Sequence, residues 1–202
     1  REELKVYGTP SFTDAINGLG ILPTKNWQHT MFDAMDKIGN KAYHEKLNVK
    51  AWHCYGCPIG CGRCTEIPEG PYRGMKGGGP EYESIAAFGS KCMVDDLYAI
   101  TAANHKANDY GLDIISTGQV IATAMEWYEE GIITKDDTDG IELSFGNADA
   151  VVKMVDKIAR REGLGDLLAE GSLRAAQKIG KGAEQYVMHV KGMEMAADGV
   201  RA

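Results

Sequence analysis

Residues 52–64 read Trp-His-Cys-Tyr-Gly-Cys-Pro-Ile-Gly-Cys-Gly-Arg-Cys, a stretch that places Cys54, Cys57, Cys61 and Cys64 close together. Three glycines and one proline separate these cysteines, so the backbone can turn tightly around a small object. Thiolates that point inward from such a loop bind soft metals, chiefly zinc and the iron of iron–sulfur clusters. We therefore interpret residues 52–64 as a metal-binding loop around which the rest of the chain is organised.

The spacing of the cysteines favours a cluster over zinc. Structural zinc sites usually combine two C-x2-C pairs separated by about 12–20 residues. Here the pattern C-x2-C-x3-C-x2-C is continuous and contains a Cys-x-x-Cys-Pro run, which is typical of ferredoxin clusters. An iron–sulfur cluster is the leading interpretation, and structural zinc, a disulfide or inert thiols are its alternatives.

The size, charge and hydropathy of the chain narrow its class. Its 202 residues are enough for a substantial core and for one or two domains. A net charge of −7 argues against nucleic acid or an anionic membrane surface as the main partner. No apolar run approaches the roughly 20 residues that a membrane-spanning helix needs. No signal peptide is recognisable, so clustered cysteines favour a reducing, cytoplasmic interior over a secreted disulfide scaffold.

Helical periodicity runs through most of the chain, because apolar residues recur at intervals of three and four. Glycines and short polar side chains stand at the expected helix ends. No set of alternating strands could make a large sheet, so the predicted fold is mainly α. The predicted helices are 10–17, 28–46, 81–88, 95–108, 116–130, 147–162 and 166–179, with an irregular stretch at 68–80 and a short extended segment at 186–190.

One loop between two predicted helices could bind a ligand. It contains Asn108, Asp109, Gly111, Leu112 and Asp113. Considered by itself, the loop is a helix C-cap, a tight turn and the next N-cap. The functional alternative is that its backbone amides and short polar side chains donate and accept hydrogen bonds with a polar heterocycle or phosphate.

Three other groups could carry acid–base chemistry. Glu81 and Glu83 follow a glycine-rich stretch, where they either favour a helix N-terminus or hold a carboxylate near a metal for proton transfer. His189 is a lone histidine, which is more often structural than catalytic. Cys92, outside the loop, is expected to be a small buried residue.

These motifs together resemble the tungsten-containing aldehyde:ferredoxin oxidoreductases. The cysteine loop, the Gly-Pro-Glu-Tyr-Glu stretch at 79–83, the Asn-x-x-Gly-Leu-Asp stretch at 108–113 and the His-x-Lys-Gly-x-Glu stretch at 189–194 occur in that family's order. Residues 20–26 and 163–171 also look like the family. The resemblance covers nearly the whole chain, and it implies a mainly α, irregular helical domain of this family's type, with a Cys-rich cluster loop.

The resemblance implies that residues 1–202 are the helical part of a larger oxidoreductase. The family has a β-rich N-terminal domain that forms a base for two pterins carrying tungsten, and a C-terminal remainder. Cys54, Cys57 and Cys61 match three ligands of a [4Fe–4S] cluster, whose fourth cysteine is expected beyond Ala202. Cys64 is not expected to be a ligand. The implied cofactors are this cluster and a tungsten, or molybdenum, bis-pterin.

Other site residues also follow from the resemblance. Residues 108–113 match a pterin-binding motif whose first position is commonly Asp, so Asn108 keeps a hydrogen-bonding side chain but loses the charge. Glu81 or Glu83, with Glu83 preferred, and His189 match groups that handle protons. A segment near the metal departs from the family at residues 195–201, which lack its tyrosine and both prolines.

Some members form homo-oligomers through an iron bound by Glu-x-x-His. Here His105 matches the histidine, but Ala102 replaces the carboxylate, so we expect no such iron.

The implied activity is oxidation of small aldehydes to carboxylic acids, with ferredoxin or another electron-transfer protein as the acceptor. A fragment of this kind would be inactive without its missing domains. The alternative within the family is a tungsten-dependent reductase of aromatic acyl-CoA thioesters, of the benzoyl-CoA type. The alternative from another class is a zinc-binding structural or interaction domain.

Overall fold

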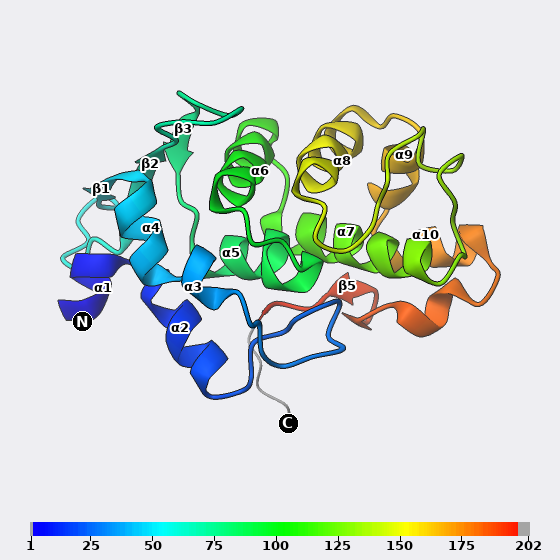
Figure 1. Ribbon diagram of the computed structural model, residues 1–202, viewed down its shortest axis with the longest axis horizontal. Coiled ribbons are helices and arrows are strands. Elements are labelled where there is room, and N and C mark those ends of the chain that lie inside the picture. Colours follow the sequence, from blue (N-terminus) through cyan, green and yellow to red (C-terminus); the bar gives the residue numbers. More distant parts are fainter. Residues whose placement is uncertain (1, 198–202) are drawn as a thin grey trace.

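The computed structural model describes residues 2–197 and is mainly helical (Figure 1). This confirms the predicted fold class. The helices are α1 Glu2–Tyr7, α2 Ser11–Gly18, α3 Met35–Ile38, α4 Asn40–Lys46, α5 Tyr82–Phe88, α6 Leu97–Tyr110, α7 Ile114–Glu129, α8 Ala148–Arg160, α9 Leu164–Leu168 and α10 Ser172–Ile179, with 3-10 turns at Ser90–Cys92 and Ala183–Tyr186. The strands are β1 Asn48–Trp52, β2 Gly62–Glu66, β3 Lys76–Gly78, β4 His189–Val190 and β5 Met193–Glu194.

Helix α7 forms the centre of the core. Every residue from Thr117 to Trp127 is buried, so this helix is covered on all sides, as a helix that is largely apolar all round must be. In Figure 1, α6, α8 and α9 lie above α5 and α7, while the chain that ends in β5 runs below them. The two layers sandwich α7 and bring loops from distant parts of the sequence to its ends.

The main helices begin at side chains that accept backbone hydrogen bonds. The Asp96 carboxylate accepts from the N–H of Tyr98 at the start of α6, and Asn147 accepts from Ala150 at the start of α8. Such N-caps satisfy donors that a helix leaves unpaired. The sequence predicted helices that begin near residues 95 and 147, and both starts are confirmed.

A small antiparallel sheet, in the order β1-β2-β3, carries the cysteine loop. Trp52 of β1 pairs with Gly62 of β2, so the residues between them form the tip of a hairpin. Strand β3 then pairs with the other edge of β2. The sequence analysis missed this sheet and treated residues 68–80 as irregular throughout, because strands of three to five residues leave little periodic signal.

The prediction of one helix over 28–46 is wrong. Lys25, Asn26 and Trp27 all adopt left-handed φ values of 48°, 46° and 70°. This turn is held from outside, since the N–H groups of Lys25 and Asn26 donate to carbonyls at residues 90 and 91. After the turn, the chain folds back in a β-bridge between Thr24 and His29, which keeps the first predicted helical residues out of a helix. Only α3 and α4 are helical in this range, and they are separated by Gly39.

The prediction of one continuous helix over 166–179 is also wrong. It is divided into α9 and α10 at Gly171, whose φ of +90° suits glycine. At this break, the Glu194 carboxylate accepts hydrogen bonds from the N–H and the hydroxyl of Ser172. The extended segment expected at 186–190 is present only as β4. Among the described residues, no helix is both long and apolar enough to cross a membrane.

Gly118 tests the close packing of α5 against α7. A Cβ at this residue would lie 2.5 Å from the Cβ of Ala87, and overpacking of this kind costs about 1–3 kcal/mol. Because that cost exceeds the helix propensity of about 1 kcal/mol gained over glycine, we expect Gly118→Ala to unfold at a lower urea concentration than the wild type.

Gly18→Ala is the matched control, since an added Cβ there meets nothing within 4 Å. It should leave the urea midpoint unchanged or raise it. A Gly118→Ala variant as stable as the control would contradict the tight α5–α7 contact.

Candidate functional site

The hairpin tip presents three cysteine thiols. Cys54 is exposed, and Cys57 and Cys61 are half-buried. The Cys57 N–H donates to the Cys54 carbonyl at 3.0 Å, which closes a turn. The backbone N–H groups of Gly60 and then Ile59 point at the Cys57 sulfur and lower the pKa of that thiol. Amide donors to a sulfur favour the thiolate, and hydrogen bonds of this kind surround the sulfurs of iron–sulfur clusters.

The two remaining cysteines lie outside this tip. Cys64 is on β2, opposite Lys50 on one neighbouring strand and Gly78 on the other. Cys92 is fully buried, and burial raises the pKa of its thiol to about 12. All five cysteines, which lie in the described part of the chain, are free. Cys54, Cys57 and Cys61 therefore belong to one hairpin tip, and none of the five cysteines is paired in a disulfide.

A closed zinc site is also not formed. Within residues 2–197, no group of three or more His, Cys, Asp or Glu side chains is placed to hold a metal ion. A zinc site of four cysteines needs all four on one tetrahedron, and Cys64 stands on a strand while the others occupy the tip. The same observation applies to Cys54, Cys57 and Cys61, so a cluster at this tip stays a prediction.

The loop between α6 and α7 contains the glycine turn that its sequence predicts, but α7 begins at Ile114, two residues before the predicted start. Gly111 has a φ of 71°, and the Leu112 N–H donates to the Ala107 carbonyl at 2.8 Å, which is the Schellman arrangement. Asp113 caps α7 by accepting the Ser116 N–H at 2.7 Å. Asp109 is exposed beside this turn. The loop is thus held rigidly by its own caps.

Asn104, in α6, joins this helix to β3 and to α5. Its buried side-chain amide donates to the Gly78 carbonyl at 2.8 Å and accepts the Ser84 hydroxyl at 2.8 Å. Asn108 donates to the same Gly78 carbonyl at 3.1 Å. Ser84 in turn accepts the Glu81 N–H at 3.3 Å. One buried amide therefore fixes the relative positions of β3, α5 and the end of α6.

His105 lies beneath the sheet and not on the surface. Its ring is buried, with Nε2 3.3 Å from the Thr65 hydroxyl, and burial lowers its pKa. A Cβ at Gly77 would lie 2.9 Å from His105 Nδ1, so glycine is what lets β3 cross the ring. Ala102 is also fully buried. The absence of a shared iron at this pair stays a prediction.

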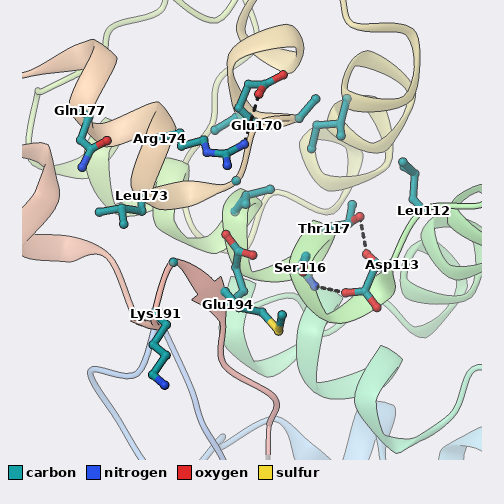
Figure 2. A pocket seen from close by; sticks show the side chains of 17 residues that line it. Leu112, Asp113, Ser116, Thr117, Glu170, Leu173, Arg174, Gln177, Lys191 and Glu194 are labelled. Atoms are coloured by element: carbon teal, nitrogen blue, oxygen red, sulfur yellow. Dashed lines mark hydrogen bonds and ion pairs between the residues drawn. The ribbon is translucent and has the colours of Figure 1, made fainter.

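A cavity of about 610 Å³ lies where the start of α7, α10 and the β4–β5 turn meet (Figure 2). Two sequence motifs that are about 75 residues apart supply its walls, with Asp113 on one side and Lys191 and Glu194 on the other. Arg174 of α10 adds a second cation. The remaining polar or charged lining residues are Ser116, Thr117, Glu170 and Gln177.

Two carboxylates of this cavity are already engaged. Glu194 accepts the N–H and hydroxyl of Ser172 at 2.7 and 2.8 Å. Glu170 pairs with Arg161 at 2.7 Å, and this hydrogen-bonded guanidinium lowers the pKa of Glu170. In contrast, only one carboxylate oxygen of Asp113 accepts the Ser116 N–H that caps α7, and Asp113 lines the cavity (Figure 2).

The two candidate glutamates face different surroundings. Glu83 accepts the Ala197 N–H at 3.0 and 3.2 Å, so its carboxylate holds the C-terminal segment. Glu81 accepts the Thr9 hydroxyl. It also lines a cavity of about 180 Å³ between the cysteine hairpin and α6, together with Asn104 and Asn108. Glu81 is therefore the glutamate that lies beside the hairpin.

His189 belongs to the β4–β5 hairpin. It pairs in register with Glu194, and its Nδ1 accepts the Gly192 N–H at 3.0 Å. This places His189 at the edge of the segment that lines the larger cavity, although it is not itself a lining residue.

The sequence analysis missed the groups that fix the C-terminal segment. The ammonium of the fully buried Lys91 donates to the Met195 carbonyl at 2.9 Å and stands 5.1 Å from the centre of the Trp27 ring. The Tyr82 hydroxyl donates to the Ala197 carbonyl at 2.6 Å. The sequence around Lys91 does not distinguish this buried lysine from the lysines on the surface. The rest of the predicted departure from the family, residues 198–201, lies outside the described residues.

Comparison with known proteins gives consistent matches along the whole chain. The family model described as aldehyde ferredoxin oxidoreductase, domains 2 and 3, matches residues 1–202. Tungsten-containing aldehyde ferredoxin oxidoreductases of Pyrococcus horikoshii and Pyrococcus abyssi are 42% and 40% identical over 198 residues, which is 96% of this chain and 32% of each relative. The chain therefore spans about a third of the length of these curated relatives.

Two further matches carry other names. The aliphatic sulfonate oxidoreductase, WOR-like subunit, of Pyrococcus furiosus is 36% identical over 89% of this chain and 29% of the relative. Among solved structures, the active site complex BamBC of benzoyl coenzyme A reductase in complex with 1,5 dienoyl-CoA superimposes with a TM-score of 0.74 at 28% identity. That match covers 95% of this chain and 28% of the other.

Removing the Asn104 side chain should destabilise the fold. In Asn104→Ala, the buried Ser84 hydroxyl loses its acceptor and a void remains, and an unsatisfied buried polar group costs about 1–3 kcal/mol. We expect a loss of about 2 kcal/mol or more in the free energy of unfolding, measured by urea denaturation. Asn108→Ala removes only the exposed bond to the same Gly78 carbonyl and should cost about 1 kcal/mol or less. Equal effects of the two substitutions would show that Asn104 is not the junction.

Proposed function

This chain belongs to the aldehyde ferredoxin oxidoreductase family, and we propose from that premise that it forms the helical part of a tungsten–bispterin enzyme. The enzyme would oxidise aldehydes to carboxylic acids and pass electrons to ferredoxin or another electron-transfer protein. We propose the cytoplasm as its location. The β-rich domain and C-terminal remainder of such an enzyme would complete the site.

The observation that carries this proposal is the convergence of two distant motifs on one cavity. Leu112, Asp113, Ser116 and Thr117 line the same space of about 610 Å³ as residues 191–194. Asp113, Lys191 and Arg174 offer charged groups at its walls, and Ser116 and Thr117 offer short polar ones. Such a mixture suits a ligand that combines a polar heterocycle with a phosphate.

The residues of the α6–α7 loop would hold one pterin. Asp113 has a carboxylate oxygen that does not serve the helix cap and can accept from the N–H groups of a heterocycle. Asn108, Asp109, Gly111 and Leu112 keep this loop in its Schellman conformation or stand beside it. When bound, the tungsten bis-pterin supplies the two-electron oxidation chemistry.

The hairpin tip would hold the cluster. Cys54, Cys57 and Cys61 supply three thiolates, and a [4Fe–4S] cluster normally takes four. We propose that the fourth comes from beyond Ala202. Asn104 and Asn108 both donate to the Gly78 carbonyl of β3, the strand next to β2. These contacts support the proposal that the two cofactors lie near enough for electron transfer.

Glu81, Glu83 and His189 are the proposed proton-handling groups. Glu83 accepts the Ala197 N–H, and His189 accepts the Gly192 N–H. Both candidate groups therefore bind backbone amides of the C-terminal segment. Glu81 lines the cavity next to the hairpin. General acid–base catalysis by a positioned carboxylate or imidazole typically contributes about 10²–10⁴-fold to the rate of an enzymatic reaction.

The second candidate is reduction of an aromatic acyl-CoA. It is favoured by the structural likeness to a benzoyl coenzyme A reductase complex at a TM-score of 0.74. The two activities separate in one assay of the holoenzyme. Aldehyde-dependent reduction of a viologen dye supports the first candidate, whereas dye-dependent reduction of benzoyl-CoA without aldehyde oxidation supports the second.

Asp113 tests the pterin proposal. Asparagine caps a helix about as well as aspartate, so Asp113→Asn should keep α7 intact while removing the charged acceptor. A hydrogen bond to a charged group is worth about 1.5–3 kcal/mol, so we expect at least a tenfold loss of pterin affinity. The measurement is the pterin and tungsten content of purified holoenzyme.

Asp96→Asn, at the N-cap of α6, is the matched control and should load fully. Full cofactor content in Asp113→Asn would contradict the proposed role of the loop.

The cluster proposal predicts different outcomes for two cysteines. Cys57→Ser removes a thiol at the hairpin tip and should abolish the visible absorption and iron content of the holoenzyme. Cys64→Ser changes a side chain on β2 and should leave both intact. Equal loss in the two variants would mean that Cys64 is a ligand, and zinc in place of iron in both would refute the cluster.

A further inference from the structure

Arg63 follows the last cysteine of the hairpin tip and is almost completely buried, with 2% of its surface exposed. Its guanidinium donates to the carbonyls of Gly60 and Gly62 at 3.0 and 2.6 Å. On its other side it donates to the carbonyls of Leu4 and Lys5 at 3.2 and 2.8 Å. Arg63 thus lies between the cysteine loop and the C-terminal end of α1.

The charge of Arg63 has no carboxylate partner among residues 2–197. All four of its hydrogen bonds go to neutral carbonyls, and it forms no ion pair in that range. The end of α1 contributes only the partial negative charge of a helix C-terminus. Buried arginines are almost always paired, because a buried charge without a counter-charge is costly.

Gly60 connects this guanidinium directly to the candidate ligands. The Gly60 carbonyl accepts from Arg63, while the Gly60 N–H points at the Cys57 sulfur. Gly60 has a φ of +65°, and a Cβ there would lie 2.1 Å from the His53 ring, so glycine is required for this geometry. The Arg63 guanidinium is therefore linked to the Cys57 thiol through the two backbone polar groups of Gly60.

We propose that Arg63 is the fixed counter-charge of an anionic cluster bound by Cys54, Cys57 and Cys61, and that it raises the reduction potential of that cluster. This inference rests on the cluster in the proposed function. A cluster ligated by thiolates is negative, and one-electron reduction adds a further negative charge. A guanidinium remains charged at every physiological pH, and in a buried setting its field is weakly screened. It therefore stabilises the reduced state more than the oxidised one, as net charge near a cluster is known to do.

A purely structural role for Arg63 makes a different prediction. If the side chain only ties the loop to α1, then its forked hydrogen bonds matter and its charge does not. Lysine keeps the charge but loses the fork, and methionine keeps much of the apolar stem but loses the charge. These two variants separate the two roles.

The experiment compares Arg63→Lys, Arg63→Met and the wild type as purified holoenzymes. Iron and acid-labile sulfide are measured first, and the cluster is then titrated with dithionite while its reduced state is followed by EPR. We expect Arg63→Met to disfavour reduction by at least about tenfold in the equilibrium constant, which is about 59 mV for one electron. Arg63→Lys should stay close to the wild type. Arg160→Gln, at the distant end of α8, is the control and should leave the potential unchanged.

Each outcome decides the matter. A lower potential in Arg63→Met alone supports the proposal, and so does loss of iron from Arg63→Met when Arg63→Lys still loads. An unchanged potential in a fully loaded Arg63→Met overturns it. Loss of iron from both variants also overturns it, because the fork and not the charge would then be essential. A wild-type holoenzyme without iron and sulfide would instead refute the proposed cluster itself.

Discussion

The buried amide of Asn104 sets the geometry on which the candidate site depends. From its place on α6, this amide donates to the Gly78 carbonyl of β3 and accepts the Ser84 hydroxyl of α5. Strand β3 pairs with β2, which leads away from the cysteine tip, and α5 carries Glu83. Since a buried amide must keep its hydrogen bonds, these segments cannot shift independently. The thiol loop, the glutamates and the α6–α7 loop are therefore held as one unit.

Two buried cations also connect separate segments of the chain at the edges of this unit. Arg63 binds carbonyls of the cysteine loop, and Lys91 binds the Met195 carbonyl beneath the Trp27 ring. In both cases a long side chain crosses from one segment to the backbone of another. Trp27 lies in a left-handed turn together with Asn26. The Asn26 side chain forms hydrogen bonds with Gln119 and Glu126 of α7. Strained turns of non-glycine residues persist where the surroundings fix them firmly and are common near functional sites.

The sequence was informative wherever local chemistry decides the structure. Asn147 and Gly111 stand at helix ends as predicted, and the mainly helical fold is the one that the periodicity indicated. It failed where distant contacts decide. The turn at Lys25–Trp27 depends on carbonyls at residues 90 and 91, and the break at Gly171 receives Glu194 from a later hairpin. Neither Asn104 nor Arg63 could be identified, because their partners are close only in the folded chain.

The central claim is that this fold holds the cluster loop and the pterin loop next to each other. The most direct measurement is anomalous diffraction from crystals of the holoenzyme at the iron and tungsten absorption edges. We expect iron density enclosed by Cys54, Cys57 and Cys61, and tungsten density near the α6–α7 loop and the hairpin that carries His189. Iron density away from these thiols, or zinc density on them, would contradict the account.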